Sequence, residues 1–149
     1  MLVFLCLCLP LTALADRTVT PPEANFTMTL PDSFTEQPLT PAEDPDLFLY
    51  WTSPDISLMG YLSWVGPNIS LSDLFTVVTG DETEESAAIP LSGQQVLYAA
   101  GRDDTGAYRV YSWLYQGNNI TLWFYYPEGN AAAGKTIDTI VASLVLFPD

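Results

Sequence analysis

AYRVYSWLYQGNNITLWFYY, residues 107–126, is the stretch that decides the fold class of this chain. Aromatic and β-branched residues dominate it, and these residue types favour strands. Gly117-Asn118-Asn119 has the composition of a turn. The stretch therefore predicts two antiparallel strands, 107–116 and 120–126, with successive side chains on opposite faces of a sheet. One face would carry Arg109, Tyr111, Trp113, Ile120, Leu122 and Phe124, and the other Tyr108, Val110, Ser112, Thr121, Trp123 and Tyr125.

Working outward, the neighbouring segments add strands and two helices. Apolar stripes at helical spacing, Leu71 to Val78 and Ile137 to Leu144, predict a helix in mid-chain and another at the end. Short links between the expected strands imply antiparallel pairing. The prediction is an α+β fold, an antiparallel sheet of about six to seven strands flanked by two main helices. The expected strands are 26–30 with 33–36 as a first hairpin, 47–53, 56–65, 88–91, 95–101, 107–116 and 120–126.

The first fifteen residues have the pattern of a signal peptide. An apolar run is followed by Ala13-Leu14-Ala15, an A-x-A site that predicts cleavage after Ala15. The run is too short to span a bilayer, although a retained membrane anchor is the alternative. No Lys or Arg precedes it, which leaves open whether Met1 is the true start. We expect a secreted, extracytoplasmic protein without stable membrane insertion after cleavage.

The rest of the chain divides into two parts. Residues 16–24 are polar and contain a Pro-Pro pair, so we expect a flexible tether. Residues 25–149 have the length of a single domain. Both cysteines, Cys6 and Cys8, lie in the leader, so this domain would have to be stable without disulfides.

The charge balance excludes one class of partner. Four Lys and Arg residues stand against 18 Asp and Glu residues, a formal net charge of −14. The basic residues, Arg17, Arg102, Arg109 and Lys135, are scattered along the sequence. Nucleic acids and anionic lipids need clustered cations, so neither is an expected partner.

Missing residue types narrow the chemistry. The sequence has no histidine, and no cysteine after the leader. This excludes histidine-dependent nucleophilic catalysis, the common zinc sites, haem ligation and thiol redox chemistry. No Gly-rich phosphate loop is present. We expect no cofactor and no enzyme activity.

Carboxylates, Tyr, Ser and Lys135 are the remaining reactive groups. We expect the acids in loops, away from aromatic neighbours on core strands. They cluster at 43–46, 81–85 and 103–104. Clustered carboxylates can bind calcium, which makes Asp44 and Asp46, and Asp103 and Asp104, weak candidate ligands. No EF-hand spacing occurs, and solvated turns explain these acids equally well.

Aromatic residues offer a candidate binding surface. Eight Tyr, four Trp and seven Phe are many for this length. Such rings can simply pack within a sheet, or they can stack on a ligand. For a surface, Trp123 and Tyr125 are the best candidates, because Ser112 and Thr121 make their face the more polar one.

The order of elements and several local strings resemble the PsbP-like superfamily. Phe26-x-Met28-x-Leu30-Pro31-x-x-Phe34 is similar to its first hairpin, and Leu49-Tyr50-Trp51 through Val65 to its central one. The block from Tyr108 to Tyr126 and the ending Ile140 to Leu144 are also typical. The resemblance covers roughly residues 25–147. It implies an antiparallel sheet sandwiched by helices, in an α/β/α arrangement, and a family of mostly non-catalytic binding or assembly factors.

These observations predict a secreted, non-catalytic binding or accessory domain whose partner is a protein or a cell-envelope component. The alternative is a small carboxylate-dependent glycan hydrolase, and a third possibility is a structural domain of a larger assembly. An enzyme would need a concave pocket with two facing acids. A binding module can instead present a flat aromatic face or groove.

Overall fold

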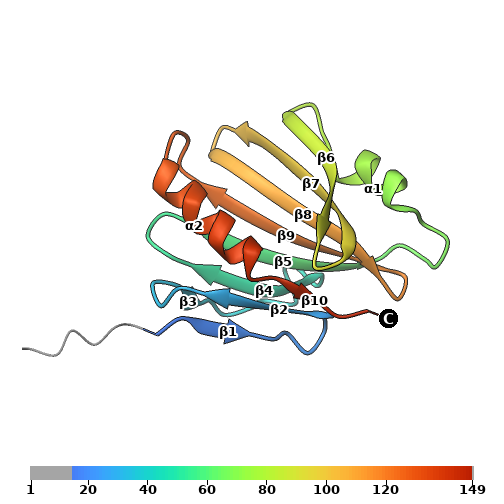
Figure 1. Ribbon diagram of the computed structural model, residues 1–149, viewed down its shortest axis with the longest axis horizontal. Helices are drawn as coiled ribbons and strands as arrows, with labels where there is room; N and C mark the ends of the chain where they lie inside the picture. The colour runs from blue at the N-terminus through green and yellow to red at the C-terminus, as the bar shows by residue number, and fades with distance from the viewer. Residues whose placement is uncertain (1–14, 149) are drawn as a thin grey trace, which may run out of the picture.

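Two antiparallel sheets and two helices make up the computed structural model, which describes residues 15–148 except for the side chain of Val77 (Figure 1). A seven-stranded sheet has the order β3-β4-β5-β9-β8-β7-β6, and a small sheet has the order β1-β2-β10. The predicted signal peptide lies, but for Ala15, outside the described residues. The elements in chain order are β1 (Arg17–Val19), β2 (Phe26–Leu30), β3 (Thr35–Glu36), β4 (Leu47–Thr52), β5 (Ser57–Trp64), α1 (Leu71–Val78), β6 (Thr83–Leu91), β7 (Gln94–Asp103), β8 (Gly106–Tyr115), β9 (Asn118–Tyr126), α2 (Ala131–Ala142) and β10 (Val145–Leu146).

The β8–β9 hairpin forms with the predicted faces. Arg109 lies opposite Phe124 and Trp113 opposite Ile120, while Val110 lies opposite Trp123 on the other face. The turn is tighter than predicted. Gln116 and Gly117 adopt positive φ values of 49° and 76°, and pairing starts at Asn118. Glycine favours this backbone region because it has no Cβ.

We call the two sides of the seven-stranded sheet the inner and outer faces. The inner face carries Tyr111, Trp113, Leu122 and Phe124, and it is covered by α2 and the small sheet. The core lies between these layers, where the buried side chains of β2, α2 and β10 meet the inner face. The outer face is covered over β7 and β8 by α1. The predicted α+β class, with helices packed on an antiparallel sheet, is confirmed.

Both helices occur where apolar spacing predicts them. Ser70 caps α1 and forms a capping box with Asp73, and Leu74 is completely buried. In α2 the buried residues include Ile137, Ile140 and Val141. A helix with one apolar stripe forms when tertiary packing covers that stripe.

Two predictions about the N-terminal part are wrong. Within the predicted tether 16–24, residues 17–19 form β1, which pairs with β2, and Arg17 lies over the ring of Trp51 at 5.3 Å. The first hairpin, 26–30 with 33–36, does not form. A turn in which the Phe34 amide donates to the Pro31 carbonyl redirects the chain, so β3 pairs with β4.

The acidic segment 81–85 also differs from its prediction as a loop. Strand β6 already begins at Thr83, with a register irregularity between Thr83 and Glu85. Pairing with β7 overrides the weak strand propensity of the glutamates. Glu84 and Glu85 therefore lie on the sheet and not in a loop.

No helix within residues 15–148 is both long and apolar enough to cross a bilayer.

Candidate functional site

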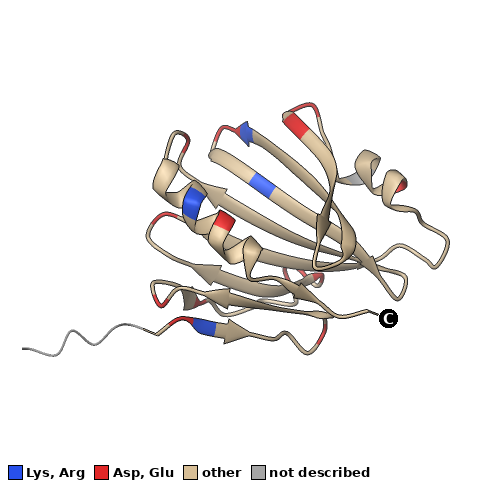
Figure 2. Ribbon diagram, viewed as in Figure 1, with Lys and Arg blue, Asp and Glu red and all other residues tan. Residues whose placement is uncertain are grey.

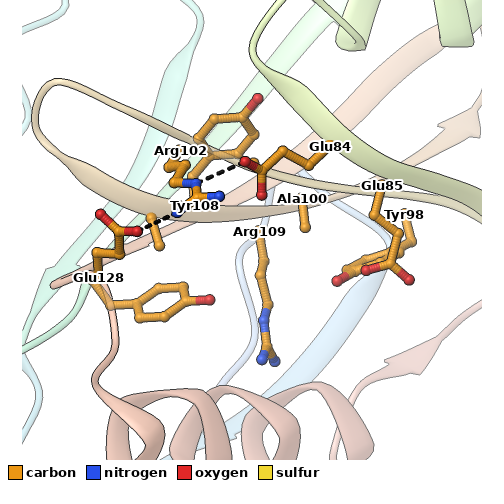
Figure 3. Close-up of a pocket in the computed structure, with 11 residues that line it drawn as sticks. Glu84, Glu85, Tyr98, Ala100, Arg102, Tyr108, Arg109 and Glu128 are labelled. Atoms are coloured by element: carbon orange, nitrogen blue, oxygen red, sulfur yellow. Dashed lines mark hydrogen bonds and ion pairs between the residues drawn. The ribbon is translucent and has the colours of Figure 1, made fainter.

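A wide cleft of about 680 Å³ opens at the end of the sheet formed by β6, β7, β8 and β9 (Figure 3). We call it the inner cleft and define it by Glu84, Glu85, Tyr98, Arg102, Arg109, Tyr126 and Glu128. Arg102 lies between two carboxylates. Its Nε donates to Glu84 at 2.7 Å, and its Nη1 donates to Glu128. These side chains are more than half exposed, so the ion pairs contribute little to stability.

Arg109 extends from β8 toward α2 and joins the sheet to the helix. Its Nη1 donates to Asp138 at 2.6 Å, and its guanidinium lies 5.7 Å from the centre of the Tyr126 ring. Gly134 permits this approach, because a Cβ there would stand 3.2 Å from Nη2. Burial alone would lower the pKa of Arg109, but its bond to Asp138 and the neighbouring Tyr126 raise the pKa above its ordinary value. Arg109 therefore remains a cation and holds α2 in place.

The expectation that no acid lies on a strand beside aromatic residues is wrong for Glu84 and Glu85. Both lie on β6 and line the inner cleft with three tyrosines. This is still a poor arrangement for glycoside cleavage. A glycosidase needs one carboxyl group shielded from water as its general acid. Glu84 and Glu128 are exposed and accept hydrogen bonds from the same arginine.

A second depression, of about 470 Å³, lies on the outer face. We call it the outer groove, and it includes both predicted binding residues. Trp123 and Tyr125 are neighbours on β9, with nearly parallel rings whose centres are 5.8 Å apart, and Tyr108 packs against both. Both rings are half-buried, so each packs on the sheet and also faces solvent. The groove is lined by Val78, Thr79, Gly80, Asp81, Glu82, Asp103, Tyr108, Trp123 and Tyr125.

Ser112 and Thr121 do not make the surface of the outer face polar, contrary to the prediction. Ser112 and Thr121 are buried, and they bond to each other at 2.9 Å. Ser112 also donates to the buried Asn119 at 2.5 Å. These polar groups satisfy one another inside the protein. The groups that the outer face exposes to solvent are its aromatic rings and the acids around them.

Aromatic side chains continue from the groove across the uncovered part of the outer face. Met59 pairs with Trp123, and Tyr50 pairs with Met59, so their side chains share that face. Tyr61 lies on the same face and donates to the Met59 sulfur at 3.6 Å. The surface formed by Tyr50, Met59, Tyr61, Trp123 and Tyr125 is called the aromatic face below.

Burial and nearby acids raise the pKa values of two hydroxyls on the aromatic face. The pKa of Tyr125 is raised by burial and then by the nearby charge of Asp103, with a further contribution from Glu82. The pKa of Tyr61 is raised by burial and by the charge of Asp44. A neighbouring negative charge disfavours ionisation of a phenol. The surroundings of the aromatic face are therefore negatively charged.

All four basic side chains belong to the inner side of the sheet; Figure 2 shows where along the ribbon these residues occur. Arg17 lies over Trp51 of the inner core, and Arg102 and Arg109 line the inner cleft. Lys135 is on α2, which packs on the inner face. Residues that are scattered along the sequence are thus gathered on one side of the fold. This leaves the outer face without a cation.

The calcium candidates lie in two separate turns. Asp46 accepts a hydrogen bond from Ser63 at 2.9 Å. Asp103 accepts from the amide and hydroxyl of Thr105, which stabilises its own turn. Within residues 15–148, no three acidic, histidine or cysteine side chains are grouped to hold a metal ion.

Most of the inner cleft could not be found from the sequence, because its residues come from four strands and the chain after β9. Tyr108 of the outer groove, in contrast, could have been found from the sequence. The alternation of β8 and β9 already places it on the face of Trp123 and Tyr125. What the sequence lacks is a signal that loop 79–82 would close one side of that surface.

No protein-family model matches the sequence, and no curated protein matches it either. Solved structures do match. The solution structure of cyanobacterial PsbP (CyanoP) from Synechocystis sp. PCC 6803 has a TM-score of 0.69, over 94% of this chain and 97% of that one. The chain has the PsbP-like fold. The sequence identity is 15%, which shows the PsbP-like fold alone.

Two further structures are similar over most of this chain. LpqN, involved in cell envelope biogenesis of Mycobacterium tuberculosis, has a TM-score of 0.52 at 12% identity, over 90% of this chain and 91% of that one. A Bacteroides thetaiotaomicron VPI-5482 protein has a TM-score of 0.52 at 15% identity, over 84% of this chain. Only 46% of the Bacteroides protein is covered, so this chain corresponds to about half of its length.

Proposed function

We propose that this chain is a non-catalytic binding domain that holds a partner, a protein or a cell-envelope component, on the outer face of its seven-stranded sheet. The observation that supports this most is the half-buried pair Trp123 and Tyr125, which lines a groove not filled by any other part of residues 15–148. Large aromatic rings that stay partly exposed are the side chains that contribute most to binding interfaces.

A catalytic role has less support. The inner cleft contains acids, but they are exposed and bonded to Arg102. In the outer groove, Asp103 is engaged in its own turn. Neither depression presents a shielded carboxyl group facing a second acid, which is the arrangement that glycoside hydrolysis requires.

We also propose that the domain works outside the cytoplasm. The proposal rests on the leader pattern that ends at Ala15, and the involvement of the structural neighbour LpqN in cell envelope biogenesis is consistent with it. N-terminal sequencing of the exported protein should give Asp16 as its first residue. A protein that stays in the cytoplasm with residues 1–15 attached would contradict the proposal.

Site-specific photo-crosslinking tests the binding face directly. p-Benzoylphenylalanine at position 123 should give a discrete crosslinked product in cells that make the protein. The matched control places the same group at Thr139, an exposed position on α2 at the opposite side of the sheet. The same products from both positions, or none from position 123, would argue against the outer face.

A further inference from the structure

The acids around the aromatic face point to the chemistry of its occupant. Asp81, Glu82 and Asp103 line the groove beside Trp123 and Tyr125. At another part of the same face, the charge of Asp44 contributes to the raised pKa of Tyr61. Since every Lys and Arg of the chain lies on the inner side, nothing on the outer face neutralises these carboxylates.

We propose that the outer groove binds an extended, lysine- or arginine-rich segment of a partner protein. This rests on the proposed function and specifies its ligand. An alkylammonium or guanidinium group placed over Trp123 would interact with the face of the ring, and carboxylates beside it would strengthen the attraction. The aliphatic stems of these side chains would cover Tyr125 and Met59 while their charges reach the acids.

Charge complementarity favours this occupant over a neutral sugar or an acidic surface. A sugar would stack on the rings but would leave the carboxylates without charged partners. An anionic lipid or polymer would be repelled by them. Steering by a chain of net charge −14 would also bring a cationic segment to the protein quickly.

Isothermal titration with hexalysine, at about 150 mM salt, tests the ligand class. A strongly acidic protein attracts polycations over its whole surface, so the control must distinguish the groove from net charge. The test variant is D81N/E82Q, which neutralises two exposed acids of the groove. The control variant is E23Q/E36Q, which neutralises two exposed acids near Trp51, on the inner side.

Both double variants have the same net charge, so only location separates them. We expect D81N/E82Q to weaken the hexalysine affinity by roughly 10-fold, and E23Q/E36Q by less than about 2-fold. Backbone amide shifts on adding hexalysine should be confined to the residues that line the groove and to Met59 beside it. Equal effects of the two double variants, or no saturable binding, would overturn the proposal.

Titrations with cellohexaose and hexaglutamate distinguish a wrong ligand class from a wrong binding face. If cellohexaose bound with amide shifts around Trp123 and hexalysine did not, the groove would remain a binding site and its cationic specificity would be wrong. If neither bound and no crosslink formed at position 123, the outer face would be rejected as a binding surface. Hexaglutamate binding as tightly as hexalysine would exclude electrostatic selection.

Discussion

Tyr111 is a buried phenol in the middle of the inner face. It is 5% exposed and packs between Tyr98 and Phe124. Burial raises its pKa from an ordinary 10.0 to about 12. Because the unfolded chain ionises at the lower pH, the contribution of Tyr111 to stability is complete below its unfolded pKa and is lost as the pH rises through its folded pKa.

Replacing this residue tests that linkage. Tyr111→Phe keeps the ring packing and removes the ionisable group. The wild type should lose roughly 2–3 kcal/mol more than Y111F in unfolding free energy across the alkaline window between the two pKa values. Urea denaturation at neutral and alkaline pH measures this difference. Parallel stability curves for the two proteins would show that Tyr111 ionises normally in the folded state.

At the scale of elements, Asn25 connects three parts of the chain. Its side chain accepts from the Trp113 indole of β8 at 3.0 Å and donates to the Phe147 carbonyl, after β10, at 2.5 Å. Its own carbonyl accepts from the Phe147 amide at 2.7 Å. The start of β2, the C-terminal end of β8 and the C-terminal tail are thereby fixed to one another.

Asn25→Ala should destabilise the protein by about 3 kcal/mol, because it leaves the buried Trp113 indole without its acceptor and the Phe147 carbonyl without its side-chain donor. Chemical denaturation measures the loss, and amide exchange should show the tail and β2 opening first. The matched change at the exposed Asn68 should cost less than about 0.5 kcal/mol. Equal effects at both positions would mean that Asn25 is not a structural connection.

Elements with a strong local pattern were predictable, and those defined by pairing were not. Leu74 and Ile137 lie on stripes whose period identifies α1 and α2. Arg17–Val19, in contrast, is polar and short, and it is a strand only because β2 offers it an edge. The glutamates of β6 are a second case, since their strand exists through its register with β7.

At the scale of the whole molecule, excess negative charge is the main electrostatic feature. Described ion pairs are few and restricted to Arg102, whose pairs are exposed, and Arg109, whose pair is partly buried, while 18 acidic residues repel one another. Screening this repulsion should stabilise the folded protein.

Raising the ionic strength from about 10 mM to about 1 M should therefore increase the urea midpoint of unfolding. Chloride salts are suitable because they add little specific stabilisation. D81N/E82Q should show a smaller increase than the wild type, since it carries less negative charge. A midpoint that falls with salt would mean that the ion pairs of Arg102 and Arg109 outweigh the repulsion.

The sequence by itself determined the fold class, the faces of β8 and β9 and the positions of both helices, because periodicity and turn chemistry act over a few neighbouring residues. It also placed Trp123 and Tyr125 together on one face. Only the tertiary structure decided what surrounds them. Loop 79–82 lines one side of the groove, Ser112 and Thr121 are buried, and the four basic residues lie on the opposite side. These features depend on contacts between residues distant in the chain, which no local pattern of side chains encodes.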